Sequence, residues 1–180
     1  MLDLITGHQG VNHISAEQIA TLNRILMGNF GSGKVVRMKD GTIEAGTLSV
    51  VIHTGYWRVE GIDMEVQEED TILLDPVTTA GASRIDDLYV EVLKDIATGN
   101  ERSEIVVIMG NEDYSPVPPA VPTRPENVTD DLLLAVKLAR CTVADDDSMT
   151  MVDYTVVYNA SNNDLGLSVV NGKLNITYNE

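Results

Sequence analysis

The sequence predicts a mainly β protein with an antiparallel sandwich or barrel-like body, an N-terminal amphipathic helix and a proline-rich strap. Short apolar runs recur about every ten residues between residues 34 and 83, separated by Gly or Pro, which is typical of sandwiches and barrels. Five of the six prolines lie within residues 115–125. Proline fixes φ and has no N–H to donate, so this strap should be extended and outside any ladder. We expect an arm and helix (1–33), the β-rich body (34–158) and a C-terminal β-hairpin (159–180).

The composition is that of a globular protein with a strong negative charge. Of the 180 residues, 43% are hydrophobic and 22% charged, which is enough for one domain with a sizeable core. The balance of 12 Lys and Arg against 28 Asp and Glu gives −16, a field that repels phosphate backbones and anionic lipid. No stretch approaches the ~20 apolar residues of a membrane span. We therefore expect no nucleic-acid partner and no membrane insertion.

The first predicted element is a helix of about 13 residues that starts at a capping box, Ser15 with Gln18, and stops at Gly28. A single helix of this length is marginal alone, so its apolar stripe must pack on the body or on a neighbouring subunit. We treat the stripe as part of a candidate assembly interface. It consists of Ile19, Leu22, Ile25 and Leu26.

The segment Gly28–Lys34 matches the first seven positions of a phosphate-binding P-loop. The eighth position, which should be Ser or Thr to hold magnesium, is Val35. The flanking elements are also in the opposite order. A P-loop follows a strand and precedes a helix, whereas here the predicted helix precedes the segment and a strand follows it. We interpret the glycines as a helix-to-strand connector.

The body should begin with short strands. In one of them Ile62, Met64 and Val66 alternate with acidic or polar residues that would face water. Trp57 is expected in the core, since aromatic residues make up only 4% of the chain and a sugar-binding face needs exposed rings. The strands predicted here are 35–38, 48–53, a run starting at 57, 62–67 and 71–74.

An antiparallel hairpin should follow, from the runs 88–93 and 104–109 with a polar linker between them. The first run alternates and should be half-buried, whereas the second is apolar almost throughout and should be buried on both faces. The strap leaves this hairpin directly. Its residues Pro118, Pro119 and Pro122 complete the candidate assembly interface.

The segment 131–143 is open to two interpretations. Acidic residues before Leu132 could cap a helix, but Leu132, Leu134, Val136 and Leu138 alternate as in a strand, which we favour. Another strand is expected at 151–158. The tail should form a hairpin with a type I′ turn at Asn171-Gly172.

The residue types that carry catalysis or bind metals do not form a recognisable pattern. His8 and His13 have the wrong helical spacing for a shared zinc, and His53 is the third and last imidazole. Cys141 follows an apolar run and should be a buried, inert thiol. The acids at 145–147 are consecutive, unlike the alternate ligands of a calcium loop, and no G-x-S-x-G turn is present. We expect no catalytic, cofactor or metal site.

Several segments resemble tail and baseplate proteins from phages and prophages of Gram-positive bacteria. The opening Ile5–Gly10 with His13–Glu17 is similar to the segment that precedes a β domain in those proteins. Arg84–Val90 resembles one of their strands, and Ile105–Gly110 with Pro116–Pro122 resembles the segment that follows it. Leu132–Ala135 with Cys141–Val143 resembles a strand of tail-fibre proteins, so the likeness covers about residues 5–143.

The resemblance implies a non-enzymatic virion protein that assembles as a symmetric homo-oligomer, often a trimer, with other tail or baseplate proteins. Such a protein would assemble in the cytoplasm of the bacterial host and would then be part of the phage tail. The chain departs from the family after the strap and shows no long fibre or receptor-binding head, which favours an oligomeric adaptor or spacer. The alternatives are a cell-surface or carbohydrate-binding module without catalytic activity, and a cryptic enzyme with a concave cluster of carboxylates.

The helix stripe generates the first prediction. Leu22→Asp places a charge in the stripe and should weaken subunit association if the helix docks on a neighbouring copy. Size-exclusion chromatography with light scattering measures the effect. Normal assembly with a loss of stability alone would instead indicate that the helix packs on its own body.

Overall fold

The computed structural model describes residues 33–39, 41–123, 129–158, 165–170 and 173–178, and this part of the chain consists of strands and their connections. The predicted helix, its stripe and most of the P-loop-like segment lie outside the described residues. The body strands are β1 (Val35–Lys39), β2 (Ile43–Gly46), β3 (Ser49–Ile52), β4 (Gly55–Val59), β5 (Ile62–Val66), β6 (Asp70–Leu73), β7 (Ser83–Asp95), β8 (Glu101–Ile108), β9 (Asp130–Ala144), β10 (Met149–Asp153) and β11 (Val156–Val157).

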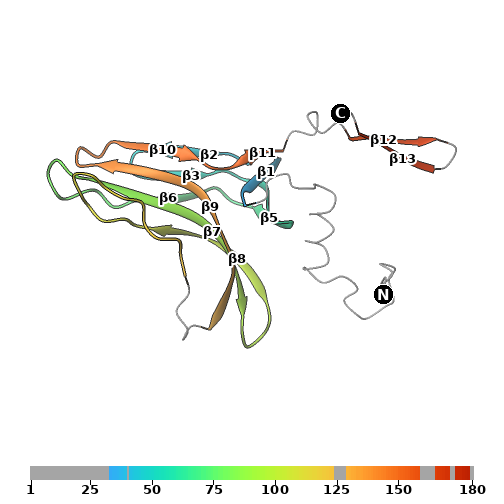
Figure 1. Cartoon of the computed structure of the whole chain (residues 1–180), viewed down its shortest axis with the longest axis horizontal. Helices are drawn as coiled ribbons and strands as arrows, with labels where there is room; N and C mark the ends of the chain where they lie inside the picture. Colours follow the sequence, from blue (N-terminus) through green and yellow to red (C-terminus); the bar gives the residue numbers. More distant parts are fainter. Residues whose placement is uncertain (1–32, 40, 124–128, 159–164, 171–172, 179–180) are drawn as a thin grey trace.

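The body strands form three sheets with the orders β11-β1-β4-β5, β10-β9-β7-β8 and β2-β3-β6 (Figure 1). Every pairing among them is antiparallel except that of β1 with β11, which is parallel. A separate hairpin is made by β12 (Leu165–Val170) and β13 (Lys173–Tyr178). The prediction of a mainly β protein is confirmed, as is the C-terminal hairpin.

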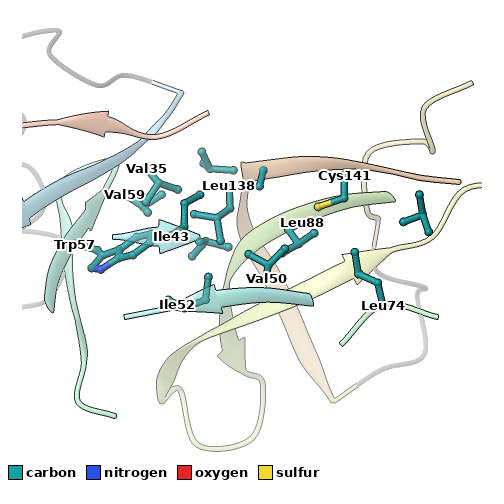
Figure 2. Close-up of a cluster of buried hydrophobic side chains, with 14 of the residues drawn as sticks. Val35, Ile43, Val50, Ile52, Trp57, Val59, Leu74, Leu88, Leu138 and Cys141 are labelled. Atoms are coloured by element: carbon teal, nitrogen blue, oxygen red, sulfur yellow. The ribbon is translucent and has the colours of Figure 1, made fainter. Parts of the chain in front are cut away.

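One hydrophobic core joins all three sheets. Figure 2 shows Trp57 from β4 beside Ile52 from β3, with Leu138 from β9 and Leu88 from β7 in the same cluster. Trp57 is 2% exposed, which confirms its expected burial. Each sheet is small, so burial against the other two sheets is what stabilises it.

The hairpin of β7 and β8 is confirmed, but the predicted burial of its two strands is reversed. In β7, Arg84 and all residues from Asp86 to Leu93 are buried, whereas β8 is half-buried from Glu104 to Ile108 and exposed before that. The reason is position: β7 lies between β8 and β9, and β8 is the outermost strand of its sheet. The run 88–93 did not reveal this, because Glu91 gave it an alternating pattern although Glu91 is buried.

In the C-terminal half of the body, one prediction is confirmed and another is wrong in part. The ambiguous segment is a strand, β9, and a bulge opposite Leu88 and Tyr89 leaves Leu138 as an extra residue. The strand expected at 151–158 is split into β10, which pairs with β9, and β11, which pairs with β1. The chain changes sheet between them, where the Tyr154 N–H donates to the Leu138 carbonyl at 3.0 Å.

Strand β2 was not predicted. Of its four residues only Ile43 is buried, so the segment lacks the alternation that marks a half-buried strand. It forms because β3 offers it a full antiparallel register, from Ile43 opposite Ile52 to Gly46 opposite Ser49.

The core generates the second prediction. Leu138 is 0% exposed, so Leu138→Ala removes buried methyl groups and leaves a cavity among three sheets. We expect the free energy of unfolding to fall by about 2–5 kcal/mol in urea denaturation. Leu133→Ala on the same strand is the control, because Leu133 is 49% exposed and should change stability by no more than about 0.5 kcal/mol. Equal losses in the two variants would contradict the proposed core.

Candidate functional site

The part of the proline strap that the structure describes lies outside every strand, as predicted. From Met109 to Thr123 the chain belongs to no strand, apart from a single bridge between Asp113 and Ser83. Of the residues proposed for an assembly interface, Pro118 is exposed while Pro119 and Pro122 are half-buried. The helix-stripe residues Ile19, Leu22, Ile25 and Leu26 lie outside the described residues.

Burial along the strap repeats every three residues. Pro116, Pro119 and Pro122 are half-buried, which is the period of a polyproline II helix with one ridge turned toward the body. Val117 and Val121 lie on the other ridges and are 70% and 62% exposed. The sequence analysis missed these two valines. The three-residue spacing of the prolines was the signal that could have found them.

The residues just before the strap, Gly110–Asp113, are its root. Glu112 anchors this root to the loop before β7. Its carboxylate accepts hydrogen bonds from the backbone N–H of Thr78 at 2.9 Å and of Thr79 at 3.0 Å. Hydrogen bonds from the Thr79 hydroxyl and from these backbone groups favour the ionised carboxylate and lower the pKa of Glu112 to about 2. The ionised form of Glu112 therefore fixes the point where the strap begins.

Two further contacts hold the same root. Asp113 and Ser83 exchange backbone hydrogen bonds at 2.9 and 3.0 Å, which makes a short bridge to the start of β7. The Gly110 N–H donates to Asp86 at 3.1 Å. A side chain at position 110 would collide with the carbonyl oxygen of Ile85, so the close approach depends on glycine.

Asp86 belongs to a buried ion pair with Arg84. The Arg84 guanidinium donates two bonds to the carboxylate, Nε to Oδ1 at 2.8 Å and Nη2 to Oδ2 at 2.9 Å, and a third to the Asp75 carbonyl at 2.6 Å. Arg84 is 5% exposed and Asp86 0%. The hydrogen bonds to Asp86 raise the pKa of Arg84 above its ordinary value. The pair joins β7 to the strap root through the Asp86 carboxylate and to the preceding loop through the Arg84 guanidinium.

The next residue, Asp87, makes a second buried cluster. Lys137 donates to its carboxylate at 2.7 Å, and Arg140 donates Nε at 2.7 Å and Nη2 at 2.9 Å. Burial would raise the pKa of Asp87, but the hydrogen bonds from Arg140 and Lys137 prevail and lower it. The Lys137 ammonium also lies over the rings of Tyr89 and Tyr154, at 5.4 and 5.6 Å from their centres.

The two buried carboxylates do not form a shared acid–base site. Asp86 and Asp87 are successive residues of one strand, so their side chains point to opposite faces of the sheet. Each is bound to its own cations. A pair that divides acid and base roles must converge on one substrate atom, and this pair does not. Their geometry is that of structural ion pairs.

Two further candidate residues from the sequence, His53 and Cys141, lie within the described part of the chain. His53 lies between Glu44 at 3.6 Å and Glu69 at 2.9 Å. Cys141 is fully buried, and burial, with the nearby Asp86 and Asp87 charges, raises the pKa of its thiol to about 12. Among the described residues, no group of three or more His, Cys, Asp or Glu side chains is arranged to hold a metal ion. Within the same residues, no helix is long and apolar enough to cross a membrane.

Comparison with known proteins does not assign this chain to a family. No protein-family profile matches the chain, and no curated protein matches its sequence. Among solved structures, the chain is similar to the crystal structure of the gene 22 product of the Bacillus subtilis phage SPP1, at 12% identity. The match covers 73% of this chain and 95% of the phage protein with a TM-score of 0.39, which is too low to establish a shared fold.

The anchor generates the third prediction. A carboxylate whose pKa is lowered on folding stabilises the protein at pH values above its unfolded pKa, and this stabilisation is lost as the pH falls through the folded pKa. Glu112 should therefore stabilise the fold fully at neutral pH and progressively less from about pH 4.5 down to about 2. Glu112→Gln should be less stable than the parent protein at neutral pH, with the difference shrinking over that range.

Chemical denaturation at a series of pH values measures this difference. Glu101→Gln is the matched control, because it makes the same change at an exposed position on β8. A stability gap between the parent and Glu112→Gln that stays constant with pH would show that Glu112 does not anchor the strap as a carboxylate.

Proposed function

We propose that this chain is a non-enzymatic structural component of a phage or prophage tail or baseplate, acting as an oligomeric adaptor or spacer. The proposal starts from the resemblance of the segments described above to tail and baseplate proteins. The observation that carries it is the strap, which is held rigidly at its root and presents apolar side chains to solvent.

Exposed apolar side chains recur in the strap and in the residues just before it. Four of the ten large hydrophobic side chains that are exposed in the described residues lie between positions 109 and 121. They are Met109, Tyr114, Val117 and Val121, at 54%, 76%, 70% and 62% exposure. Isolated apolar residues on a surface need no explanation, whereas several on one short segment favour an interaction surface.

The stiffness of the strap supports the same role. Binding orders the groups that make contact, and a segment that is already ordered loses less entropy. Proline restricts the strap, and the bonds of Glu112, Asp113 and Gly110 fix its direction relative to β7. The three-sheet body would then act as a spacer between such contacts. We propose a homo-oligomer, with a trimer as the expected state, in contact with other tail or baseplate proteins of the virion.

The alternative, a carbohydrate-binding module, needs neighbouring exposed rings. The exposed rings in the described residues include Tyr56 on β4, at 50%, and Tyr114, while the single tryptophan is buried. These two are the exposed rings among the described residues, one on β4 and one just before the strap, so this arrangement lends that function no specific support.

The strap generates the fourth prediction. The double variant Val117→Asp and Val121→Asp places two charges where an apolar contact is proposed. Each buried valine contributes about 1.5 kcal/mol, so association should weaken by roughly a hundredfold or more. Light scattering on the purified chain, alone and with the products of neighbouring genes, measures the change.

The control is Val152→Asp with Val157→Asp, which introduces the same charges at valines that are 54% and 59% exposed but lie on β10 and β11. Unaltered assembly of the strap variant, or an equal loss in both variants, would contradict a specific role for the strap.

A further inference from the structure

A hollow opens where the outermost strands of the three sheets come together. The strands β5, β6 and β8 each end the order of their own sheet, and all three contribute residues to a cavity of about 420 Å³. A volume of this size is in the range of ligand-binding clefts and is sufficient for one or two side chains. The strap takes no part in the hollow, which is therefore a separate surface.

The floor of the hollow is apolar. Ile52, Trp57 and Val90 belong to the buried core, at 0%, 2% and 3% exposure, and they line the hollow from below. Met64 and Ile105 are half-buried and line it from β5 and β8. The hollow thus lies directly over the core that joins the sheets.

Four of the six other lining residues are acidic. Glu65, Glu68, Asp70 and Glu104 contribute to the lining, and it contains neither Lys nor Arg. Arg102 lies 3.6 Å from Glu104 and offsets part of that charge, and Glu65 accepts a hydrogen bond from Gln67 at 3.4 Å. The balance remains strongly negative, so an apolar group should enter most readily when it is accompanied by positive charge.

We propose that this hollow is the docking site for an extended segment of another protein, in which a Leu- or Met-sized side chain lies between Lys or Arg residues two positions away on each side. In an extended chain, residues i and i±2 point to the same side, so the apolar side chain can enter the hollow while the cations reach its acidic lining. The strands β5 and β8 are the last of their sheets, and extended segments of partner proteins commonly bind along such edge strands.

The charge argues for a different protein as the occupant. Residues 1–32 carry Asp3 and Glu17 against Arg24, and residues 159–180 carry Asp164 and Glu180 against Lys173, so each terminal segment has a net charge of −1 with His neutral. A second copy brings a net charge of −16. None of these supplies the flanking cations that the lining calls for.

The single tryptophan makes the site directly testable, because Trp57 forms part of the floor. The probe is the peptide Lys-Ser-Leu-Ser-Lys, titrated into the full chain by calorimetry while Trp57 fluorescence is recorded. We expect saturable binding with a Kd of about 0.1–1 mM, a change in Trp57 emission, and weakening at high salt. The peptides Glu-Ser-Leu-Ser-Glu and Lys-Ser-Ser-Ser-Lys should bind much more weakly.

The protein variant that tests the lining is Glu68→Gln with Asp70→Asn, two exposed positions. Loss of two exposed ion pairs should weaken binding roughly threefold to tenfold. Asp131→Asn with Asp147→Asn removes the same charge from exposed sites outside the hollow and should leave the affinity unchanged.

Four results would overturn the proposal: no saturable binding, binding heat without any change in Trp57 emission, equal affinity for the leucine-free peptide, or equal weakening by the two double variants. Self-association of the parent chain that Glu68→Gln with Asp70→Asn abolishes would also overturn it, in favour of a second copy as the occupant. Because the strap valines are untouched, either outcome here is independent of the strap experiment.

Discussion

The structure depends on the burial of two adjacent carboxylates in its central strand. Asp86 and Asp87 are both 0% exposed, and an unpaired buried charge would be strongly unfavourable. Arg84 neutralises Asp86 on one face of β7, and Lys137 with Arg140 neutralises Asp87 on the other. Only with these partners in place can β7 lie between β8 and β9 with both faces covered.

The two ion pairs have different consequences because they face different parts of the molecule. Asp87 binds side chains of β9, so it fixes the pairing of the two longest strands. Asp86 binds the Gly110 N–H and, through Arg84, the carbonyl of Asp75, so it ties the start of the strap to the body. Breaking either pair by removing one partner leaves the other charge buried, which is the more damaging change.

The strap and the hollow use the same body in different ways. The strap presents valines that lie on its solvent-facing side. The hollow lies over core residues, between the outermost strands of the three sheets. The first is apolar along a stiff segment and suits another apolar surface. The hollow has an apolar floor and an acidic lining around that floor, so it suits a partner with positive charge. The two surfaces allow one chain to contact two kinds of neighbour.

The sequence by itself determined the local features of this protein. Alternation in the apolar runs placed β3, β5 and β9, the Asn-Gly pair predicted the C-terminal hairpin, and the prolines required an extended strap. These features depend on backbone geometry and on residues close in the chain. The strap valines could also have been inferred, since a period of three follows directly from the proline spacing.

Only the tertiary structure decided which strand is central, where the chain changes sheet, and which side chains meet at the hollow. The alternating pattern of β7 contains acids that look exposed. Asp87 is one of them, and it is buried because Lys137 and Arg140, 50 and 53 residues away in the chain, donate hydrogen bonds to it. Likewise, β2 is a strand because β3 pairs with it, and β8 is half-buried because it is outermost. Burial and charge compensation depend on neighbours distant in the chain, which local pattern does not specify.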